Sequence, residues 1–213
     1  MKNANRVSLY GMVILLCVIL FAVSGCGGNS PAPAKSNATG KPQYGGTLKV
    51  VVGTVSSLDP QMEAADEPMS RHIFETPLSL DENGGVQTGL CTYKYSDDAL
   101  TLSLILRDGV KFHNGSPVKA EDVAASISRW ANNVSFGKSY VGKYMDSISA
   151  ADDKTVVIKF KSVASLALTS LAYEYMGAYV MPKAVCEEYA SSPVINTAKI
   201  IGTGPYKLSE WKQ

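Results

Sequence analysis

The stretch SDDALTLSLILRDGVKFHNGSPVKAEDVAASISRW, residues 96–130, carries the clearest structural signals in this chain of 213 residues. Its first part alternates leucine with other residues, so that Leu100, Leu102, Leu104 and Leu106 are spaced by two. Because successive side chains in a β-strand point to opposite faces, this pattern predicts a strand with one leucine face. Residues 107–109 then predict a turn, and the Asn-Gly pair at 114–115 favours a tight primed hairpin turn.

The second half of the same stretch predicts a helix over residues 120–132. Its apolar residues recur at the spacing i, i+3, i+4, i+7, and they are Ala120, Val123, Ala124, Ile127, Trp130 and Ala131. Glu121 and Asp122 fall in the first turn, where negative charge interacts favourably with the helix dipole.

Further elements are expected before this stretch. Residues 45–53 (GGTLKVVVG) are apolar at both odd and even positions after a glycine turn, which predicts a strand buried on both faces. Residues 67–76 (EPMSRHIFET) predict a short helix with Met69, His72 and Ile73 on its inner face.

Other elements are expected after it. Residues 155–160 (TVVIKF) predict a strand, and residues 163–173 and 183–189 predict short helices. Residues 206–211, which follow a Gly-Pro turn, have the pattern of a strand that is just beginning. The body of the chain is therefore predicted to be a mixed α/β fold of about one domain, without repeats.

The N-terminus has the pattern of an export signal. Residues 1–6 contain two bases and no acid, residues 7–23 carry no charge, and V-S-G-C ends the segment at Cys26. This ending resembles the lipobox of bacterial lipoproteins, which predicts that residues 1–25 are a signal peptide and that Cys26 carries the lipid anchor. The alternative is an uncleaved membrane anchor, because about 17 apolar residues lie at the lower limit of a span. Residues 26–43 are rich in Gly, Ser and Pro and predict a flexible tether.

The charge of the chain argues against nucleic acid as a partner. Removal of residues 1–25 takes away Lys2 and Arg6 and no acid, so 20 bases against 19 acids become 18 against 19. Nucleic-acid binding would need a basic face. Cys91 and Cys186 are expected to be buried free thiols, with a disulfide as the alternative in an exported chain. The sequence shows no metal-ligand spacing, and we predict neither a metal nor a cofactor.

Seven segments, in this order, resemble the extracytoplasmic solute-binding proteins of peptide and nickel ABC importers, family 5. They are GGTLKV (45–50), LDP (58–60), IFETPLSLD (73–81), the stretch 96–130, DDKTVVIKF (152–160), MPK (181–183) and GTGPYKLSEW (202–211). One departure is Lys119, which stands where Thr or Ser is common in the family. The helix is therefore expected to lose a side-chain cap worth about 1 kcal/mol.

The resemblance implies a periplasmic-binding-protein-like α/β fold of class II type, in which two lobes close on a ligand. Residues 44–77 and 162–213 would form the first lobe and residues 78–161 an inserted subdomain. Members of the family are more than twice as long. We therefore expect a truncated N-terminal part with an incomplete first lobe and no second lobe, which alone would bind ligand weakly or not at all.

The implied function is that of a monomeric, lipid-anchored receptor on the outer face of the cytoplasmic membrane. It would bind peptides and deliver them to the permease and ATPase of an importer. The candidate ligand-binding residues are Glu63, Asp66, Glu67, Tyr173, Glu174 and Tyr175; the alternative is that they are solvated acids and packing aromatics.

Other functions remain open to different degrees. A lipoprotein that senses a peptide or binds a partner without transport fits the same sequence, as does a nickel- or haem-binding member of the family. An enzyme is not expected, because the chain has no G-x-S-x-G or HExxH motif and His113 lies in a tight turn.

Overall fold

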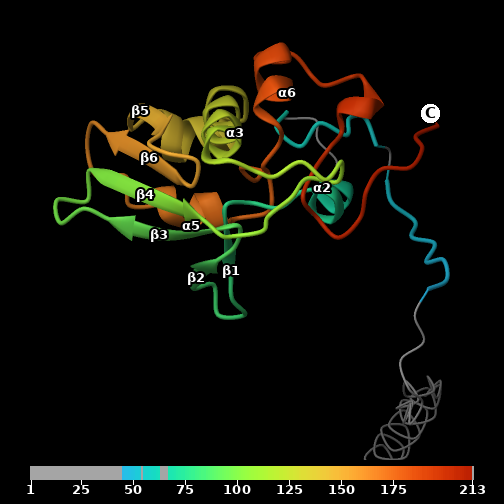
Figure 1. Cartoon of the computed structure of the whole chain (residues 1–213), viewed down its shortest axis with the longest axis horizontal. Helices are drawn as coiled ribbons and strands as arrows, with labels where there is room; N and C mark the ends of the chain where they lie inside the picture. Colours follow the sequence, from blue (N-terminus) through green and yellow to red (C-terminus); the bar gives the residue numbers. More distant parts are fainter. Residues whose placement is uncertain (1–44, 54, 63–66, 213) are drawn as a thin grey trace, which may run out of the picture. The chain divides into compact units, whose positions relative to one another are not determined.

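The computed structural model of this protein describes residues 45–53, 55–62 and 67–212. Regular structure within these ranges follows a mixed order of helices and strands (Figure 1). The elements are α2 (Glu67–Ile73), β1 (Leu78–Leu80), β2 (Val86–Thr88), β3 (Cys91–Tyr95), β4 (Thr101–Leu106), α3 (Ala120–Asn133), α4 (Ser135–Gly137), the π-helical turn η1 (Lys138–Gly142), β5 (Met145–Ala150), β6 (Thr155–Phe160), α5 (Ala167–Ala172), α6 (Lys183–Glu188) and the 3₁₀ turn η2 (Thr197–Lys199). All of them belong to one compact unit, Val50–Gln213.

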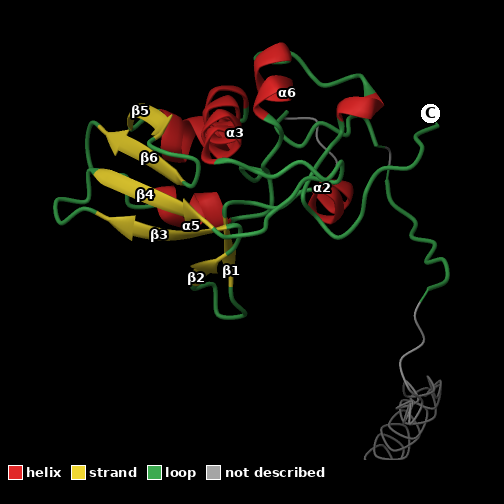
Figure 2. Ribbon diagram, in the orientation of Figure 1, coloured by secondary structure: helices red, strands yellow, loops and turns green. Residues whose placement is uncertain are grey.

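The centre of the fold is an antiparallel sheet of four strands in the order β3-β4-β6-β5, with α3 lying across one face (Figures 1 and 2). A separate ladder pairs β1 with β2. Leu102 pairs with Ile158 and Leu104 with Val156, so the apolar side chains of β4 and β6 lie on the face that α3 covers. The predicted leucine face, the helix over 120–132 and the strand over 155–160 are confirmed.

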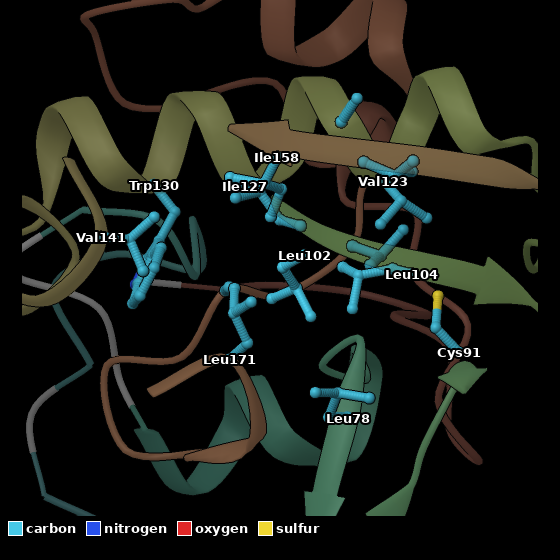
Figure 3. Close-up of a cluster of buried hydrophobic side chains, with 14 of the residues drawn as sticks. Leu78, Cys91, Leu102, Leu104, Val123, Ile127, Trp130, Val141, Ile158 and Leu171 are labelled. Atoms are coloured by element: carbon cyan, nitrogen blue, oxygen red, sulfur yellow. The ribbon is translucent and has the colours of Figure 1, made fainter. Parts of the chain in front are cut away.

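The main hydrophobic core lies between α3 and the sheet (Figure 3). Ile127 and Trp130 of α3 are fully buried and face Leu102 and Leu104 of β4, while Leu171 of α5 closes the cluster. A second cluster joins the C-terminal part of the chain to α2, and its buried members are Leu58, Ile73, Phe74, Tyr179, Met181, Val185, Cys186, Val194 and Ile200. The division at residues 78 and 161 stays a prediction.

The predicted strand over residues 45–53 is wrong. The described residues of this segment have no regular secondary structure, and Leu48 and Val51 are 83% and 98% exposed. A strand is stabilised by hydrogen bonds to a neighbouring strand, and none of the described strands pairs with this segment. An apolar pattern therefore does not produce a strand here by itself.

The segment after Gly204 does not form a strand either. The backbone N–H of Gly204 donates to Ile73 O, and that of Tyr206 donates to His72 O. These bonds satisfy the carbonyls at the end of α2. Residues 202–206 therefore cap this helix instead of forming a strand, and we call this segment the strap. Leu208 and Trp211 pack on the second cluster, whereas Tyr206 is 62% exposed.

Two local predictions were also wrong. His72 does not lie on the inner face of α2 but is exposed. On the surface, its ring lies against that of Tyr206 and its Nδ1 contacts the carbonyl of Pro68. The 113–115 turn is not a primed turn, since Gly115 has positive φ (86°) and Asn114 does not. A turn closed by Gly115 N–H to Phe112 O, with Gly115 left-handed, resembles a three-residue hairpin loop with a glycine bulge.

The N-terminus of α3 is capped in an unexpected way. Lys119 offers no side-chain cap, as predicted. However, the Asp122 carboxylate accepts a hydrogen bond from the Lys119 N–H at 2.9 Å and a second from the Lys183 N–H at 2.7 Å. The acid of the first turn therefore provides capping and also ties α3 to the start of α6.

Candidate ligand-binding site

The loop that follows α5, residues 173–177 (YEYMG), is held firmly by its backbone. Trp130 Nε1 donates to Met176 O at 2.6 Å, and the Tyr179 hydroxyl donates to Glu174 O at 2.6 Å. Met176 has φ of 55°, a left-handed conformation that non-glycine residues rarely adopt. Such backbone strain persists only where the surroundings fix it, and it is concentrated at binding and active sites.

Side-chain and backbone packing also restrains this loop. A Cβ at Gly177 would meet Tyr173 O at 2.6 Å, so glycine allows the chain to fold back closely on itself. The ring of Phe136, in α4, lies 5.5 Å from that of Tyr173, which in turn lies 6.4 Å from that of Tyr175. Tyr173 and Tyr175 nevertheless remain 40% and 53% exposed. The loop thus combines a fixed backbone with exposed aromatic side chains.

These side chains open onto a hollow of about 410 Å³. Its lining residues are Arg71, Leu80, Ala172, Tyr173, Glu174 and Tyr175. Three of the six were predicted ligand-binding residues, and the structure brings them together beside Arg71 of α2. The sequence prediction missed Arg71, which lies about 100 positions away from the loop in the chain. The predicted helix over 67–76 includes Arg71, but nothing in its pattern singled this residue out.

The other predicted site residues are not placed at this hollow. Glu63, Asp66 and Cys26 lie outside the described residues, and so does the side chain of Glu67, whose backbone begins α2. Their proposed roles stay predictions.

A buried polar network fixes the segment that precedes these acids. Arg129 of α3 and Asp59 form an ion pair at 2.7 Å with side chains 2% and 0% exposed. Gln61 accepts from Arg129 at 3.1 Å and donates to Tyr179 O at 2.6 Å, while Val194 N–H donates to Asp59 at 2.8 Å. Every member has several partners, so the network is fully satisfied and joins the LDP motif to the RW pair of α3.

A second hollow, of about 610 Å³, adjoins this network, because Val194, whose N–H donates to Asp59, lines it. It is mainly apolar, and its lining includes Leu58, Met62, Val194, Ile195 and Trp211. It contains no charged side chain, and its polar lining residues are Ser56, Ser57 and Thr197.

His113 is used structurally. Its Nδ1 accepts from Gly202 N–H at 3.3 Å, and its Nε2 donates to Gly204 O at 2.9 Å. A Cβ at Gly202 would meet Ile73 O at 2.0 Å, so this glycine permits the strap to lie against α2. Both ring nitrogens are therefore occupied by backbone, and neither is available to act as a base on a substrate.

The two described cysteines, Cys91 and Cys186, are free and buried, as expected. Burial raises the pKa of the Cys91 thiol to about 12 and that of the Cys186 thiol to about 11. A buried thiol with a raised pKa is not a nucleophile at neutral pH.

Within the described ranges, His, Cys, Asp and Glu form no group of three that would hold a metal ion. None of the helices described there is long and apolar enough to cross a membrane.

Residues 85–213 match the family described as bacterial extracellular solute-binding proteins, family 5 Middle. The probable peptide ABC transporter periplasmic-binding protein y4tO of Sinorhizobium fredii is 31% identical over 76% of this chain and 30% of its own. The oligopeptide-binding protein AppA of Bacillus subtilis is 29% identical over 95% of this chain and 38% of its own.

A similar solved structure is that of the binding protein AgaA in complex with agropinic acid, from A. tumefaciens R10. It has a TM-score of 0.64 at 25% identity and covers 76% of this chain and 32% of its own. The fold is thus periplasmic-binding-protein-like, as predicted. The chain spans about a third of the length of the curated relatives it matches.

Proposed function

Because this chain belongs to the bacterial extracellular solute-binding proteins of family 5, we propose that it acts as the peptide-binding component of an ABC importer. The observation that carries the proposal is the likeness to the oligopeptide-binding protein AppA along 95% of this chain. The protein would work outside the cytoplasm, bind a peptide between two lobes and deliver it to the permease and ATPase. It would act as a monomer and without chemistry of its own.

The fixed loop at residues 173–177 supports this proposal. Recognition loops carry exposed polar and aromatic side chains on a rigid support, since a preorganised site loses less entropy on binding. Tyr173, Glu174 and Tyr175 meet this description, with a backbone held by Trp130 and Tyr179. We assign these three side chains to the first-lobe wall of the peptide site. Glu63, Asp66 and Glu67 would extend that wall with negative charge.

Titration of the full-length protein with a mixed peptide library, followed by thermal unfolding, tests this function. A ligand present at about one hundred times its Kd stabilises the folded state by about 2.7 kcal/mol, which raises Tm by several degrees. No shift with peptides, together with a shift on adding Ni²⁺ or haem, would replace the peptide function by the metal- or haem-binding alternative. The sensor function would be favoured if peptides raise the Tm of the protein but deletion of its gene leaves the uptake of peptides by the cells unchanged.

We also propose that a lipid on Cys26 anchors the protein to the outer face of the cytoplasmic membrane. The V-S-G-C ending and the polar segment after it support this assignment. Replacement Cys26→Ala should abolish metabolic labelling with palmitate and release the protein from the membrane fraction. Label retained on the variant would refute Cys26 as the site, and Cys17→Ala serves as the control that leaves labelling intact.

A further inference from the structure

Two Asn-Gly pairs, 83–84 and 114–115, lie in exposed turns of the chain. The backbone nitrogen of a glycine can attack the side-chain amide of the preceding asparagine, because glycine has no side chain to obstruct the approach. The backbones of the two pairs are alike. Gly84 and Gly115 have φ of 80° and 86°. Their N–H groups donate to Asp81 O at 3.0 Å and to Phe112 O at 2.8 Å, respectively. Backbone conformation therefore does not distinguish the two sites.

The side-chain amides of the two asparagines differ. Ser116 donates twice to Oδ1 of Asn114, from its backbone N–H at 3.0 Å and from its hydroxyl at 2.7 Å. A backbone N–H can only donate, so it orients the amide with its oxygen toward Ser116 and its NH₂ group away. None of the residues that the structure describes donates to the side chain of Asn83.

Two donors on one carbonyl oxygen form the arrangement that stabilises an oxyanion. When a nucleophile adds to an amide carbon, negative charge develops on the oxygen, and preorganised N–H and O–H donors lower the energy of that state. We propose that Asn114 and Gly115 form a site of self-catalysed deamidation, in which Ser116 supplies the oxyanion donors. All three residues are exposed, so water reaches the site.

The reaction needs water and no other reactant. The Gly115 nitrogen forms a bond to Cγ of Asn114 and gives up its proton, while the bond from Cγ to Nδ2 breaks and the amide nitrogen leaves with that proton as ammonia. Water then opens the cyclic imide. Attack of water at Cγ gives aspartate with the normal backbone, whereas attack at the backbone carbonyl of residue 114 gives isoaspartate, in which the main chain runs through the side-chain carbonyl.

The strap is the part of the molecule that isoaspartate at position 114 would affect. His113 makes three hydrogen bonds to the strap. Its backbone N–H donates to Gly202 O at 2.9 Å, its Nε2 donates to Gly204 O at 2.9 Å, and its Nδ1 accepts from Gly202 N–H at 3.3 Å. Isoaspartate inserts one methylene into the main chain directly after His113. Deamidation by this route therefore loosens the strap.

Peptide mapping of the full chain, incubated at mildly alkaline pH, tests the site. The tryptic peptides 112–119 and 72–94 carry Asn114 and Asn83, and each reports the replacement of NH₂ by OH as a change in mass. In the native protein Asn114 should deamidate about fivefold faster than Asn83, which is the factor that one hydrogen bond contributes. In concentrated urea, where the Ser116 contacts are lost, the two rates should converge.

Variants test the role of the hydroxyl. Ser116→Ala removes one donor and should slow the reaction at Asn114 about fivefold without changing the rate at Asn83, which is the internal control. Ser116→Thr keeps a hydroxyl and should keep the faster reaction at Asn114.

Hydrogen exchange tests the effect on the strap. Native protein that carries isoaspartate at position 114 should exchange the amides of residues 202–206 faster than fresh protein. Asn114→Asp adds the same charge without lengthening the main chain, so its strap should exchange at the wild-type rate.

The contrary results each overturn a defined part of the proposal. Native Asn114 that deamidates no faster than Asn83, or no deamidation at either position, overturns the site. An unchanged rate at Asn114 in Ser116→Ala, or a slowed rate in Ser116→Thr, overturns the role of the hydroxyl. Unaltered exchange of the strap in the isoaspartate form overturns the link to the strap. None of these measurements involves a ligand, so their outcome is independent of the proposed function.

Discussion

The ion pair between Asp59 and Arg129 lies beside the second cluster, since Asp59 follows Leu58 and accepts a hydrogen bond from the N–H of Val194. Both side chains are buried, and Arg129 also donates to Tyr189 O at 2.8 Å and to Ser192 O at 2.9 Å. Removal of one charge leaves the other buried without its counter-charge, which in proteins costs about 3–5 kcal/mol. The same contact joins residues that are 70 positions apart in the chain.

Asp59→Asn should therefore lower the free energy of unfolding by about 3 kcal/mol or more, as measured by urea denaturation. Asp108→Asn is the matched control, because Asp108 pairs with Lys154 on the surface, where exposed ion pairs contribute little. Equal effects of the two substitutions would show that the buried pair is no more important than a surface pair.

Gly202 is the second residue whose identity is dictated by its surroundings. A Cβ would lie 2.0 Å from Ile73 O and 2.7 Å from Phe74 Cδ1, so Gly202→Ala forces the strap away from α2. We expect a loss of about 3 kcal/mol or more in the free energy of unfolding, at the upper end of the range for overpacking. Gly53→Ala adds a methyl group with no atom within 4 Å and should change stability little. A Gly202→Ala protein as stable as Gly53→Ala would mean that the strap does not lie where the structure puts it.

At the level of elements, an indole hydrogen bond from Trp130 of α3 stabilises the loop after α5. Trp130→Phe keeps an aromatic ring in the core and removes the bond to Met176 O. Loss of a hydrogen bond worth about 1 kcal/mol should speed amide exchange of residues 173–177 about fivefold relative to β4.

The control for that experiment is Ile127→Val, which removes a methylene from the same buried face of α3 without touching the loop. It should lower protection in β4 and in the loop alike. Exchange in the loop that rises no more in Trp130→Phe than in Ile127→Val would contradict a role for the indole bond in holding it.

The same elements show what the sequence reveals and what it leaves hidden. The alternation in β4 and the helical spacing in α3 are strong because each element buries one face, and both were predicted. Strand β5 (MDSISA) was missed, since an edge strand with Ser and Asp on its outer side has almost no apolar pattern. Segments 45–53 and 206–211 have strand-like patterns, but hydrogen bonding from a neighbour decides whether a strand forms.

The candidate site was predictable only in part for a related reason. Tyr173, Glu174 and Tyr175 are consecutive, so a sequence can single them out as a group. Arg71 lines the same hollow in the folded chain, and nothing in its local sequence indicates this. Contacts between distant segments, such as those of His113 with Gly202 and Gly204, are likewise visible only in the folded chain.

For the whole molecule, the two buried thiols link stability to alkaline pH. Burial raises the folded-state pKa of Cys91 to about 12 and of Cys186 to about 11, against about 9 in the unfolded chain. Below pH 9 both states hold the proton and the full stability is present. Between pH 9 and the folded-state values only the unfolded chain releases it, so stability falls as pH rises, by about 1.4 kcal/mol per pH unit for each thiol.

Lysines and tyrosines titrate in the same pH range, so the contribution of the two thiols is measured by comparison with a variant that lacks them. The double variant with Cys91→Ala and Cys186→Ala lacks both groups, so its free energy of unfolding should fall between pH 9.5 and 10.5 by about 2 kcal/mol less than that of the wild type. Urea denaturation at the two pH values measures the difference, and the comparison of slopes cancels the cost of the smaller side chains. If the free energy of unfolding changed equally with pH in the wild type and the double variant, the thiols would not be shielded from water. In that case iodoacetamide would modify Cys91 and Cys186 in the native protein at pH 8.5 as fast as in 8 M urea, whereas we expect mass mapping to find both unmodified until the protein unfolds.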